Sequence, residues 1–410
     1  MEHKVLMLGG RRAGKSTILS SILHELHKTP GSVCTIDDIT DYTRVIRDKT
    51  GNEYKLKPLK DKRLEIMSFI KDHDRLNMAT NKHINFVIDM AKTNAAGSYD
   101  LLVSATGKNA NTPKLNLRFY DVPGEWMVST SEDHPTLKSM IKESDIFIIA
   151  IDTPFLMQDD EDLNDVYNRI DEITSALTSS ISIADSADWK QIILCPVKCE
   201  KWTNSGKSKE VIKKVCQAYK RLMNTWVNNE NVHIWIMPIN TAGCVESTEL
   251  RPAKLFFKDK SDRTGTPCSY DELTGIIIDK DGNHFNDRDV ERIEDDKMWS
   301  YEFKSNYVDI PLSWYHCNGK PFSTRFCEQP AFHILKFIVE KEENVNKEKA
   351  RQEQMSYERK NWFEKFLTIL FQPTFGHYLP VWRGVIDELD RLELIKKSDD
   401  DIKRVKEFIN

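Results

Sequence analysis

The stretch that most constrains this chain is residues 5–17, Val-Leu-Met-Leu-Gly-Gly-Arg-Arg-Ala-Gly-Lys-Ser-Thr. Its first four residues are apolar and predict a buried strand, and from Ser16 onward apolar residues recur at helical spacing. Between strand and helix lies Gly9-x4-Gly14-Lys15-Ser16, the phosphate-binding loop pattern in the context that it requires. A chance glycine-rich turn is the alternative, and the flanking strand and helix argue against it. The pattern therefore predicts polyphosphate binding.

Each residue type in this loop has a chemical role. Gly9 and Gly14 allow backbone angles and a close approach that a Cβ atom would block. The loop amides and the helix N-terminus would face the phosphates, where the helix dipole favours negative charge. Lys15 would reach the terminal phosphates, and the Ser16 hydroxyl would ligate Mg2+. The predicted nucleotide-binding residues here are Gly9, Gly10, Arg12, Ala13, Gly14, Lys15, Ser16 and Thr17.

Composition sets the class of protein. The 410 residues suffice for one elaborated α/β domain or for two domains, and the formal net charge of -5 makes no electrostatic case for nucleic-acid binding. None of the eight cysteines forms a Cys-x2-Cys pair, so neither a zinc site nor a disulfide framework is indicated, and a reducing cytosol fits best. No run of about 18 apolar residues predicts a membrane span. The first strand begins within five residues of Met1, which leaves no room for a signal peptide.

A second motif follows the apolar strand expected at 115–120. The chain continues as Asp121-Val122-Pro123-Gly124-Glu125. An Asp at the carboxyl end of a strand, followed by x-x-Gly, supplies the second magnesium-side group of a P-loop NTPase: Asp121 would hold Mg2+ through water, and Gly124 would offer a backbone amide to the γ-phosphate. Asp-x-x-Gly alone is also a common turn. Its position after an apolar strand and downstream of the loop favours the metal-side role.

Strands and helices then alternate. Further strands are predicted at 99–105, 146–152, 191–197 and 233–237, and helices at 159–178 and 208–227. Fully apolar strands are typical of a parallel sheet that is covered on both faces. We therefore expect an α/β fold, with a doubly wound, mostly parallel sheet of the P-loop NTPase type and ligands at the carboxyl ends of the strands.

Two insertions are expected in this sheet. Residues 31–98 are longer than an ordinary loop and contain helical patterns, for example at 64–69 and 84–90, which predicts a helical insertion. Residues 244–327 are rich in turn residues and aromatics and predict a β-rich insertion. Within it, 275–283 indicates a strand entering an Asp-Gly hairpin rather than a calcium loop, because the glycine is misplaced and no closing Glu follows.

The remaining residues complete the domain plan. A helix beginning at Pro330 is expected to close the nucleotide-binding domain, which would comprise 1–243 and 328–345. Residues 346–410 would form a C-terminal helical region. In that region 361–371 is strongly apolar and would dock back on the domain or meet a partner, and 381–409 predicts an amphipathic helix or a pair of helices.

Four elements now stand in the order found in GTPases: the P-loop, Asp-x-x-Gly, Val197-Lys198-Cys199-Glu200 after a strand, and Thr241-Ala242-Gly243 after the next. On these motifs the chain resembles the translation-factor and Ras-like (TRAFAC) class of P-loop GTPases. The resemblance implies that Lys198 packs over the guanine ring, that Glu200 accepts hydrogen bonds from guanine N1 and N2, and that an amide of Thr241 or Ala242 contacts O6. Two residues depart from the class pattern: Val197 replaces the usual Asn or Thr, and Glu200 is one methylene longer than Asp.

A narrower similarity joins Gly-Gly-Arg-Arg-Ala-Gly-Lys-Ser, Asp-Val-Pro-Gly-Glu and the segment 326–330. These look like the double-GTPase branch of bacterial conflict and antiviral defence systems. The similarity implies a GTPase that controls an effector encoded nearby.

Two charged positions have open roles in hydrolysis. Glu125 stands where class members often place a water-positioning Gln, but it could equally be an acid that satisfies amides at a helix start. Arg11 or Arg12 could act as an arginine finger in cis, or both could simply be exposed to solvent. The threonine that would ligate Mg2+ in a switch segment cannot be placed among Thr80, Thr93 and Ser98 by position alone.

The sequence therefore favours a GTPase that binds GTP or GDP with Mg2+ and works as a nucleotide-dependent switch on a protein effector or regulator. Two alternatives stay open. The same loop could serve an ATPase or another phosphotransferase, because Val197-Lys198-Cys199-Glu200 departs from the guanine-reading pattern. The chain could also be a scaffold that binds nucleotide without turnover, although its complete set of Lys15, Ser16 and Asp121 argues against that reading.

Overall fold

A computed structural model gives the architecture of the chain. The residues it describes are 2–10, 13–28, 34–47, 53–61, 63–64, 67–68, 96–106, 114–158, 161–181, 188–257, 267–271, 276–278, 284–285, 310–357 and 379–407.

An eight-stranded sheet organises the fold, in the order β15-β9-β8-β7-β1-β6-β5-β2. Its five central strands run parallel to one another. Strands β5 and β2 at one edge and β15 at the other pair antiparallel to their neighbours. The bounds are β1 Glu2–Leu8, β2 Cys34–Asp38, β5 Gly97–Ala105, β6 Leu115–Asp121, β7 Ile146–Asp152, β8 Lys190–Val197, β9 Val232–Ile236 and β15 Lys403–Arg404. The predicted α/β class with a mostly parallel P-loop NTPase sheet is confirmed.

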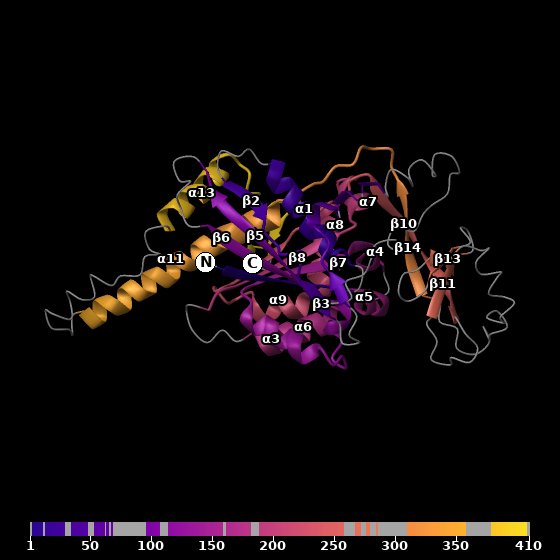
Figure 1. Ribbon diagram of the computed structural model, residues 1–410, viewed down its shortest axis with the longest axis horizontal. Helices are drawn as coiled ribbons and strands as arrows, with labels where there is room; N and C mark the ends of the chain where they lie inside the picture. The colour runs from indigo at the N-terminus through magenta and orange to yellow at the C-terminus, as the bar shows by residue number, and fades with distance from the viewer. Residues whose placement is uncertain are drawn as a thin grey trace.

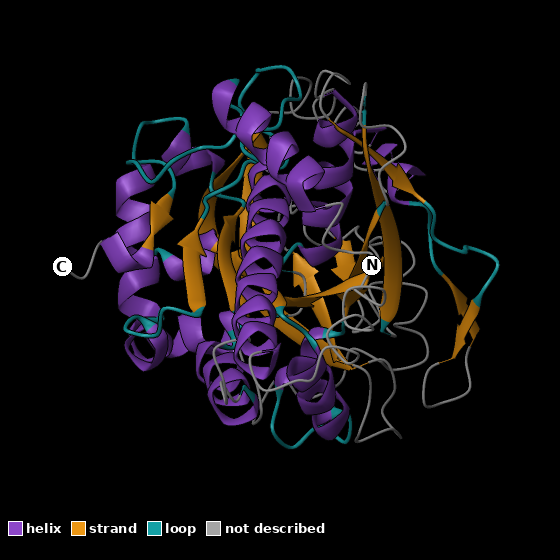
Figure 2. Ribbon diagram, turned by 90° about the vertical axis from the view of Figure 1, so that its left-hand side faces the viewer, coloured by secondary structure: helices purple, strands orange, loops and turns teal. Residues whose placement is uncertain are grey.

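Helices cover both faces of this sheet (Figures 1 and 2). Every residue of β7 is buried, and its side chains alternate between two hydrophobic cores, with Ile148 in one and Ile149 in the other. The first core includes α1 Lys15–Lys28, α11 Gln329–Tyr357 and α13 Leu379–Arg391. The second includes α3 His134–Glu143, α6 Ile170–Ser180, α8 Ser208–Ala218 and α9 Lys220–Trp226. A continuous apolar run is what burial on both faces demands.

The segment expected as a helical insertion begins with strands, and helical residues follow at 59–61, 63–64 and 67–68, in the region where the sequence predicts a helix at 64–69. Strand β2 joins the main sheet beside β5, and β3 Val45–Arg47 pairs with β4 Glu53–Lys55. In β2, buried Cys34 and Ile36 alternate with exposed side chains, which is the period of a half-buried strand rather than of a helix. The helix expected at 84–90 lies outside the described residues.

Two helices that the sequence presents as continuous are each broken. Helix α5, Glu161–Asn168, ends before Arg169, whose φ of 54° is left-handed, and α6 follows directly. Helices α8 and α9 are separated at Tyr219, which is fully buried. The amphipathic period survives both breaks, and therefore periodicity alone could not reveal them.

A second sheet confirms the β-rich character of the residues after 244. It has five antiparallel strands in the order β13-β12-β11-β10-β14 and lies at the right of Figure 1. Its strands are β10 Val245–Phe257, β11 Pro267–Asp271, β12 Ile276–Ile278, β13 His284–Phe285 and β14 Ile310–Cys317. The predicted hairpin at 275–283 is the β12–β13 pair.

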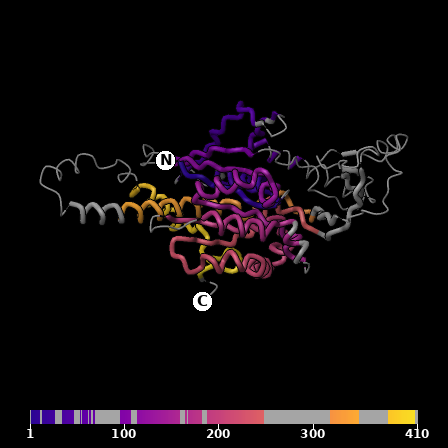
Figure 3. The backbone as a smooth tube through the Cα atoms, turned by 90° about the horizontal axis from the view of Figure 1, so that it is seen from below, coloured from indigo at the N-terminus to yellow at the C-terminus, as the bar shows by residue number. Residues whose placement is uncertain are grey.

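The C-terminal residues return to the main domain. Helix α11 extends beyond the sheet at the end opposite the second sheet (Figures 1 and 3), and α13 packs against it. Trp382 and Leu389 of α13 are buried in the first core. The chain then forms β15 and the short helix η5 Val405–Glu407, so a purely helical 381–409 is wrong. Residues 361–371 lie outside the described part of the chain.

Asp145 fastens α11 to the start of β7 and supplies a test of this arrangement. Its carboxylate pairs with Lys190 Nζ at 2.9 Å and with Lys341 Nζ at 2.5 Å, and both lysines are largely buried. Removing one member of a buried ion pair costs about 3 kcal/mol or more, because the remaining charge loses its partner. We therefore expect Asp145→Asn to lower the free energy of unfolding by about 3 kcal/mol at neutral pH, as measured by urea denaturation.

The pH dependence of that loss checks its cause. Burial would raise the pKa of Asp145, but Lys341 and Lys190 outweigh it and hold the pKa below its ordinary 3.8. The stabilisation is therefore complete above about pH 4 and disappears as the pH falls through the lowered pKa. The exposed pair Lys4–Glu143 is the control, since solvent screens it and Glu143→Gln should lower the free energy of unfolding much less. Equal losses for both variants would contradict the expectation.

Candidate functional site

The loop between β1 and α1 is shaped by close backbone contacts. Gly9 has a φ of 142°, and a Cβ atom there would lie 2.6 Å from the Ala150 carbonyl oxygen. A Cβ on Gly10 would lie 1.9 Å from the carbonyl oxygen of Tyr167, at the end of α5. Gly14 has a φ of 96°, which side chains rarely adopt. Both glycines of the motif and the Gly10 between them are therefore required by sterics, as the sequence pattern predicts for Gly9 and Gly14.

Lys15 lies under this loop and is only 6 % exposed. Its ammonium donates hydrogen bonds to the carbonyl oxygens of Gly9 at 3.0 Å and Gly10 at 3.1 Å. Burial lowers the pKa of Lys15, while the charges of Asp121 and Glu125 act in the opposite direction. No carboxylate in the described part of the chain forms an ion pair with it. A buried cation held by carbonyls alone is favourable for capturing an anion.

Ser16 and Asp121 meet at the carboxyl ends of β1 and β6. The Ser16 hydroxyl donates a hydrogen bond to Asp121 Oδ2, and Asp121 is 1 % exposed. The two residues are 105 positions apart in sequence and are brought together by the parallel pairing of β1 with β6. A hydroxyl and a carboxylate oxygen are the donors that Mg2+ accepts beside substrate phosphates, so these two residues fit that ion. No group of three or more His, Cys, Asp or Glu in the described residues could hold a metal by itself.

The residues after Asp121 form a short 3-10 helix, η2 Gly124–Met127. Gly124 is buried and Glu125 is exposed. Glu125 is close enough to Lys15 for its charge to act on the lysine pKa. Ala13 is buried, and Thr17 lies in the first turn of α1. Arg11 and Arg12 lie outside the described residues, as do Thr80 and Thr93.

Val197 supplies an apolar support for the loop. Val197 is buried, and its Cγ2 atom would lie 3.5 Å from a Cβ placed on Gly14. The departure from Asn or Thr at this position therefore replaces a polar contact beneath the loop by a packing contact.

Lys198, the next residue, has a left-handed φ of 56° and forms an ion pair with Asp152. Asp152 ends β7 in register with Val197 and is 5 % exposed. Asn168 fixes its backbone, because its side chain accepts from Asp152 N at 2.6 Å and donates to Asp152 O at 3.2 Å. Asp152 Oδ1 has no hydrogen-bond partner in the described part of the chain. Sequence reasoning missed Asp152, although a polar residue directly after a buried strand is the signal that identified Asp121.

Glu200 begins the short helix α7 Glu200–Thr203 and turns inward. It is 3 % exposed, and its Oε1 accepts hydrogen bonds from the amides of Thr241 at 3.1 Å, Ala242 at 3.3 Å and Gly243 at 3.4 Å. Burial raises the pKa of Glu200 and these amides oppose that shift. Glu200 thus lies against Thr241 and Ala242, and its carboxylate is engaged with the loop itself.

The loop carrying Thr241 and Ala242 is also joined to residues from much later in the chain. Asn240 and Arg325 exchange backbone hydrogen bonds, both at 3.0 Å, and Ser323 N donates to Ala242 O at 3.0 Å. Cys327 Sγ lies 3.1 Å from Asn240 O. The segment just before α11 therefore positions the same edge of the site.

No protein-family model and no curated protein sequence matches this chain. Two solved structures of the S. cerevisiae Ski7 GTPase-like domain are similar to it. The one bound to GDP and inorganic phosphate shows 14% identity and a TM-score of 0.31 over 59% of this chain and 43% of that chain. The one bound to GTP shows 11% identity and a TM-score of 0.30 over 79% of this chain and 72% of that chain. This chain thus spans less than half of the first structure, and the strand order and the loop after β1 carry the fold assignment.

The close contact at Gly10 gives a direct test of the site. Gly10→Ala places a methyl group against the Tyr167 carbonyl, which must separate α5 from the loop. We expect nucleotide affinity to fall about tenfold or more, as measured with a fluorescent guanine nucleotide, and the melting temperature to drop.

Gly384 in α13 is the matched control. A Cβ there meets no atom within 4 Å, and alanine favours helix over glycine by about 1 kcal/mol. Gly384→Ala should leave affinity unchanged and stability equal or higher. If Gly10→Ala binds nucleotide as well as the parent protein, the loop is not the phosphate site.

Proposed function

We propose that this protein binds a nucleoside triphosphate, GTP, with Mg2+ and hydrolyses it, so that the nucleotide acts as a switch. The observation that carries this proposal is the buried Lys15 beneath a glycine loop, next to the Ser16–Asp121 pair at the carboxyl ends of adjacent parallel strands. Ligands of open parallel sheets bind at that edge. The P-loop GTPase class is the family to which we assign it.

Each residue of the site would have its own role. Lys15 would exchange its carbonyl partners for phosphate oxygens, and the amides of the loop would hold the rest of the polyphosphate. Ser16 and Asp121 would hold Mg2+, which neutralises phosphate charge when bound. Gly124 would offer its amide to the terminal phosphate, and Glu125 would orient the attacking water. Arg11 and Arg12 extend the loop, where Arg11 is proposed as an additional catalytic cation.

The base would lie beside Lys198, in the place where Thr241 and Ala242 face β8. The Lys198–Asp152 ion pair supports this assignment, since it fixes the lysine stem as a flat apolar surface for a ring. One observation favours a second candidate, an ATPase or another phosphotransferase. The Glu200 carboxylate that would select guanine already accepts three backbone amides. A competition between GTP and ATP therefore belongs in the first experiment.

Switching would act through the segments that touch the terminal phosphate. Residues 121–128 follow Asp121, and hydrolysis would release them. A protein effector or regulator would read that change, and a bacterial defence system controlled from the cytoplasm is the setting we propose. Of the helices that the structure describes, none combines the length and apolar character that crossing a membrane requires.

Lys15→Ala and Asp121→Asn test the proposal as a pair. The lysine variant loses a charge-assisted contact to phosphate worth about 2–3 kcal/mol, so its affinity for the triphosphate should fall roughly 100-fold. The affinity of Asp121→Asn for nucleotide should no longer change when Mg2+ is added. Calorimetric titration of GTP and of ATP, each with and without Mg2+, measures both effects.

The competing functions give different results in the same titrations. If ATP binds more tightly than GTP, the protein is an ATPase or another phosphotransferase rather than a GTPase. Tight binding without phosphate release would identify a scaffold. Unchanged affinity in Lys15→Ala would end the proposal in all its forms.

Glu125→Ala separates chemistry from binding. Because Glu125 is exposed, its loss should leave the fold and nucleotide affinity intact. We expect single-turnover hydrolysis to slow roughly 10- to 100-fold, which is the range of a positioning group. The nearby exposed Glu132→Ala is the control. An unchanged rate would remove Glu125 from the mechanism.

A further inference from the structure

A cavity of about 410 Å3 lies at the opposite end of the main sheet from the phosphate loop. Gln191 and His233, near the starts of β8 and β9, line it from the sheet, whereas Lys15, Asp121 and Lys198 follow the carboxyl ends of their strands. Helix α11 and residues 395–404 form its other walls. Its volume is within the range of roughly 300–1,000 Å3 that small-molecule sites occupy.

Flat rings form part of this cavity. Trp235 and His333 pack with their centroids 4.1 Å apart, and His233 contacts Phe337 edge-to-face at 5.7 Å. Burial lowers the pKa of both histidines to about 4, so their rings are neutral near pH 7. His333 Nε2 is fixed by a 3.1 Å contact with Lys396 O. Neutral rings held in place offer stacking surfaces for another ring.

The rim of the cavity is basic. Lys336, Lys396, Lys397 and Arg404 line it, against the single carboxylate of Glu340. Lys336 is paired with Asp390 at 3.1 Å, but neither Lys397 nor Arg404 forms an ion pair in the described part of the chain. The Arg404 guanidinium lies 6.0 Å from the Trp235 ring centroid, which directs it over the aromatic wall. An anionic group would find two cations available beside a ring.

Gln191 offers a hydrogen-bond acceptor to a ligand in the cavity. It is 1 % exposed, and its Nε2 donates to His333 O at 3.3 Å. Its Oε1 is buried without a hydrogen-bond partner among the described residues. A buried acceptor without a hydrogen bond destabilises the protein, and a donor on a bound ligand would remove that cost.

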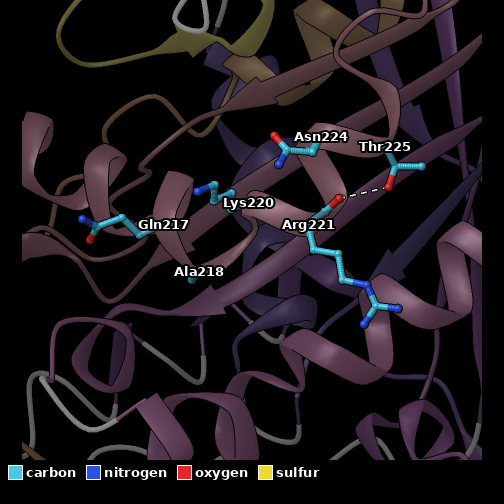
Figure 4. A pocket seen from close by; sticks show the side chains of 6 residues that line it. All are labelled: Gln217, Ala218, Lys220, Arg221, Asn224 and Thr225. Atoms are coloured by element: carbon cyan, nitrogen blue, oxygen red, sulfur yellow. Dashed lines mark hydrogen bonds between the residues drawn. The ribbon is translucent and has the colours of Figure 1, made fainter.

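A second cavity, on α8 and α9, lacks the features of the cavity beside α11. Six residues between α8 and α9 line it, and Figure 4 shows the side chains of Gln217, Lys220 and Arg221 pointing in different directions. It contains no aromatic ring, and its polar groups do not converge. The cavity beside α11 has both features that a binding site requires.

We infer that the cavity beside α11 binds a small anion that carries a planar ring, of the nucleoside monophosphate class. Its ring would stack against Trp235, an amino group on that ring would donate to Gln191 Oε1, and its phosphate would contact Arg404 and Lys397. This site is separate from the phosphate loop, and the inference does not depend on what the loop binds.

Calorimetric titration of AMP into the full-length protein tests the inference, with adenosine and ribose 5-phosphate as partial ligands. We expect one AMP per chain, with weaker binding of either partial ligand. Arg404→Gln should weaken AMP binding about tenfold or more, the effect of losing a charge-assisted phosphate contact. Lys406→Gln is the matched control, because this exposed lysine on the same segment does not line the cavity. Lys15→Ala should bind AMP as the parent protein does.

Each result of these titrations either supports or overturns the inference. Absence of saturable AMP binding overturns the inference, as does equal binding by the parent protein and Arg404→Gln. AMP binding that is lost in Lys15→Ala but retained in Arg404→Gln would place the ligand at the phosphate loop instead. Should Arg404→Gln fail to fold by circular dichroism, the exposed Lys397→Gln replaces it with the same expected direction.

Discussion

The buried ammonium of Lys15 is the constraint on which the site depends. Taking an isolated charge out of water is expensive, and among the described residues the carbonyl oxygens of Gly9 and Gly10 accept its hydrogen bonds. Those carbonyls belong to Gly9 and Gly10, which are pressed against Ala150 of β7 and Tyr167 of α5. A side chain at either glycine would therefore push the loop away from β7 or α5. The close packing of the loop against the sheet therefore also holds these two carbonyl oxygens beside the lysine.

The rest of the site shows the same use of neighbouring strands. Asp121, Asp152 and Glu200 are buried acids at or just after the ends of β6, β7 and β8. Each has a partner from another element: Ser16 of α1, Lys198 after β8, and the amides after β9. Because each acid joins two strand ends, the edge of the sheet is held by a chain of polar contacts. A ligand at this edge would meet groups whose positions are already fixed.

The sequence could predict the elements whose signal is local. The continuous apolar run of β7, the glycine spacing and Asp121 are all visible in short windows, and each lies where it was expected. What it could not predict depends on partners far along the chain. Strand β2 exists because β5 offers an edge, and the break at Arg169 leaves the apolar period unchanged. The inward turn of Glu200 depends on amides about forty residues away, which no window around Glu200 contains.

The two ends of the sheet are connected through α11. At its start, Cys327 and Arg325 contact Asn240, which precedes the loop that Glu200 holds. Gln329, the first residue of α11, donates to Leu394 O at 2.9 Å and accepts from Lys396 N at 2.8 Å, on the segment that borders the cavity. Contact alone does not make two sites communicate, because coupling requires that both ligands prefer the same arrangement of α11. Helix α11 nevertheless begins beside the loop at 240–243, and its next turns border the cavity. A ligand that displaced α11 at the cavity would therefore move residues that lie next to that loop.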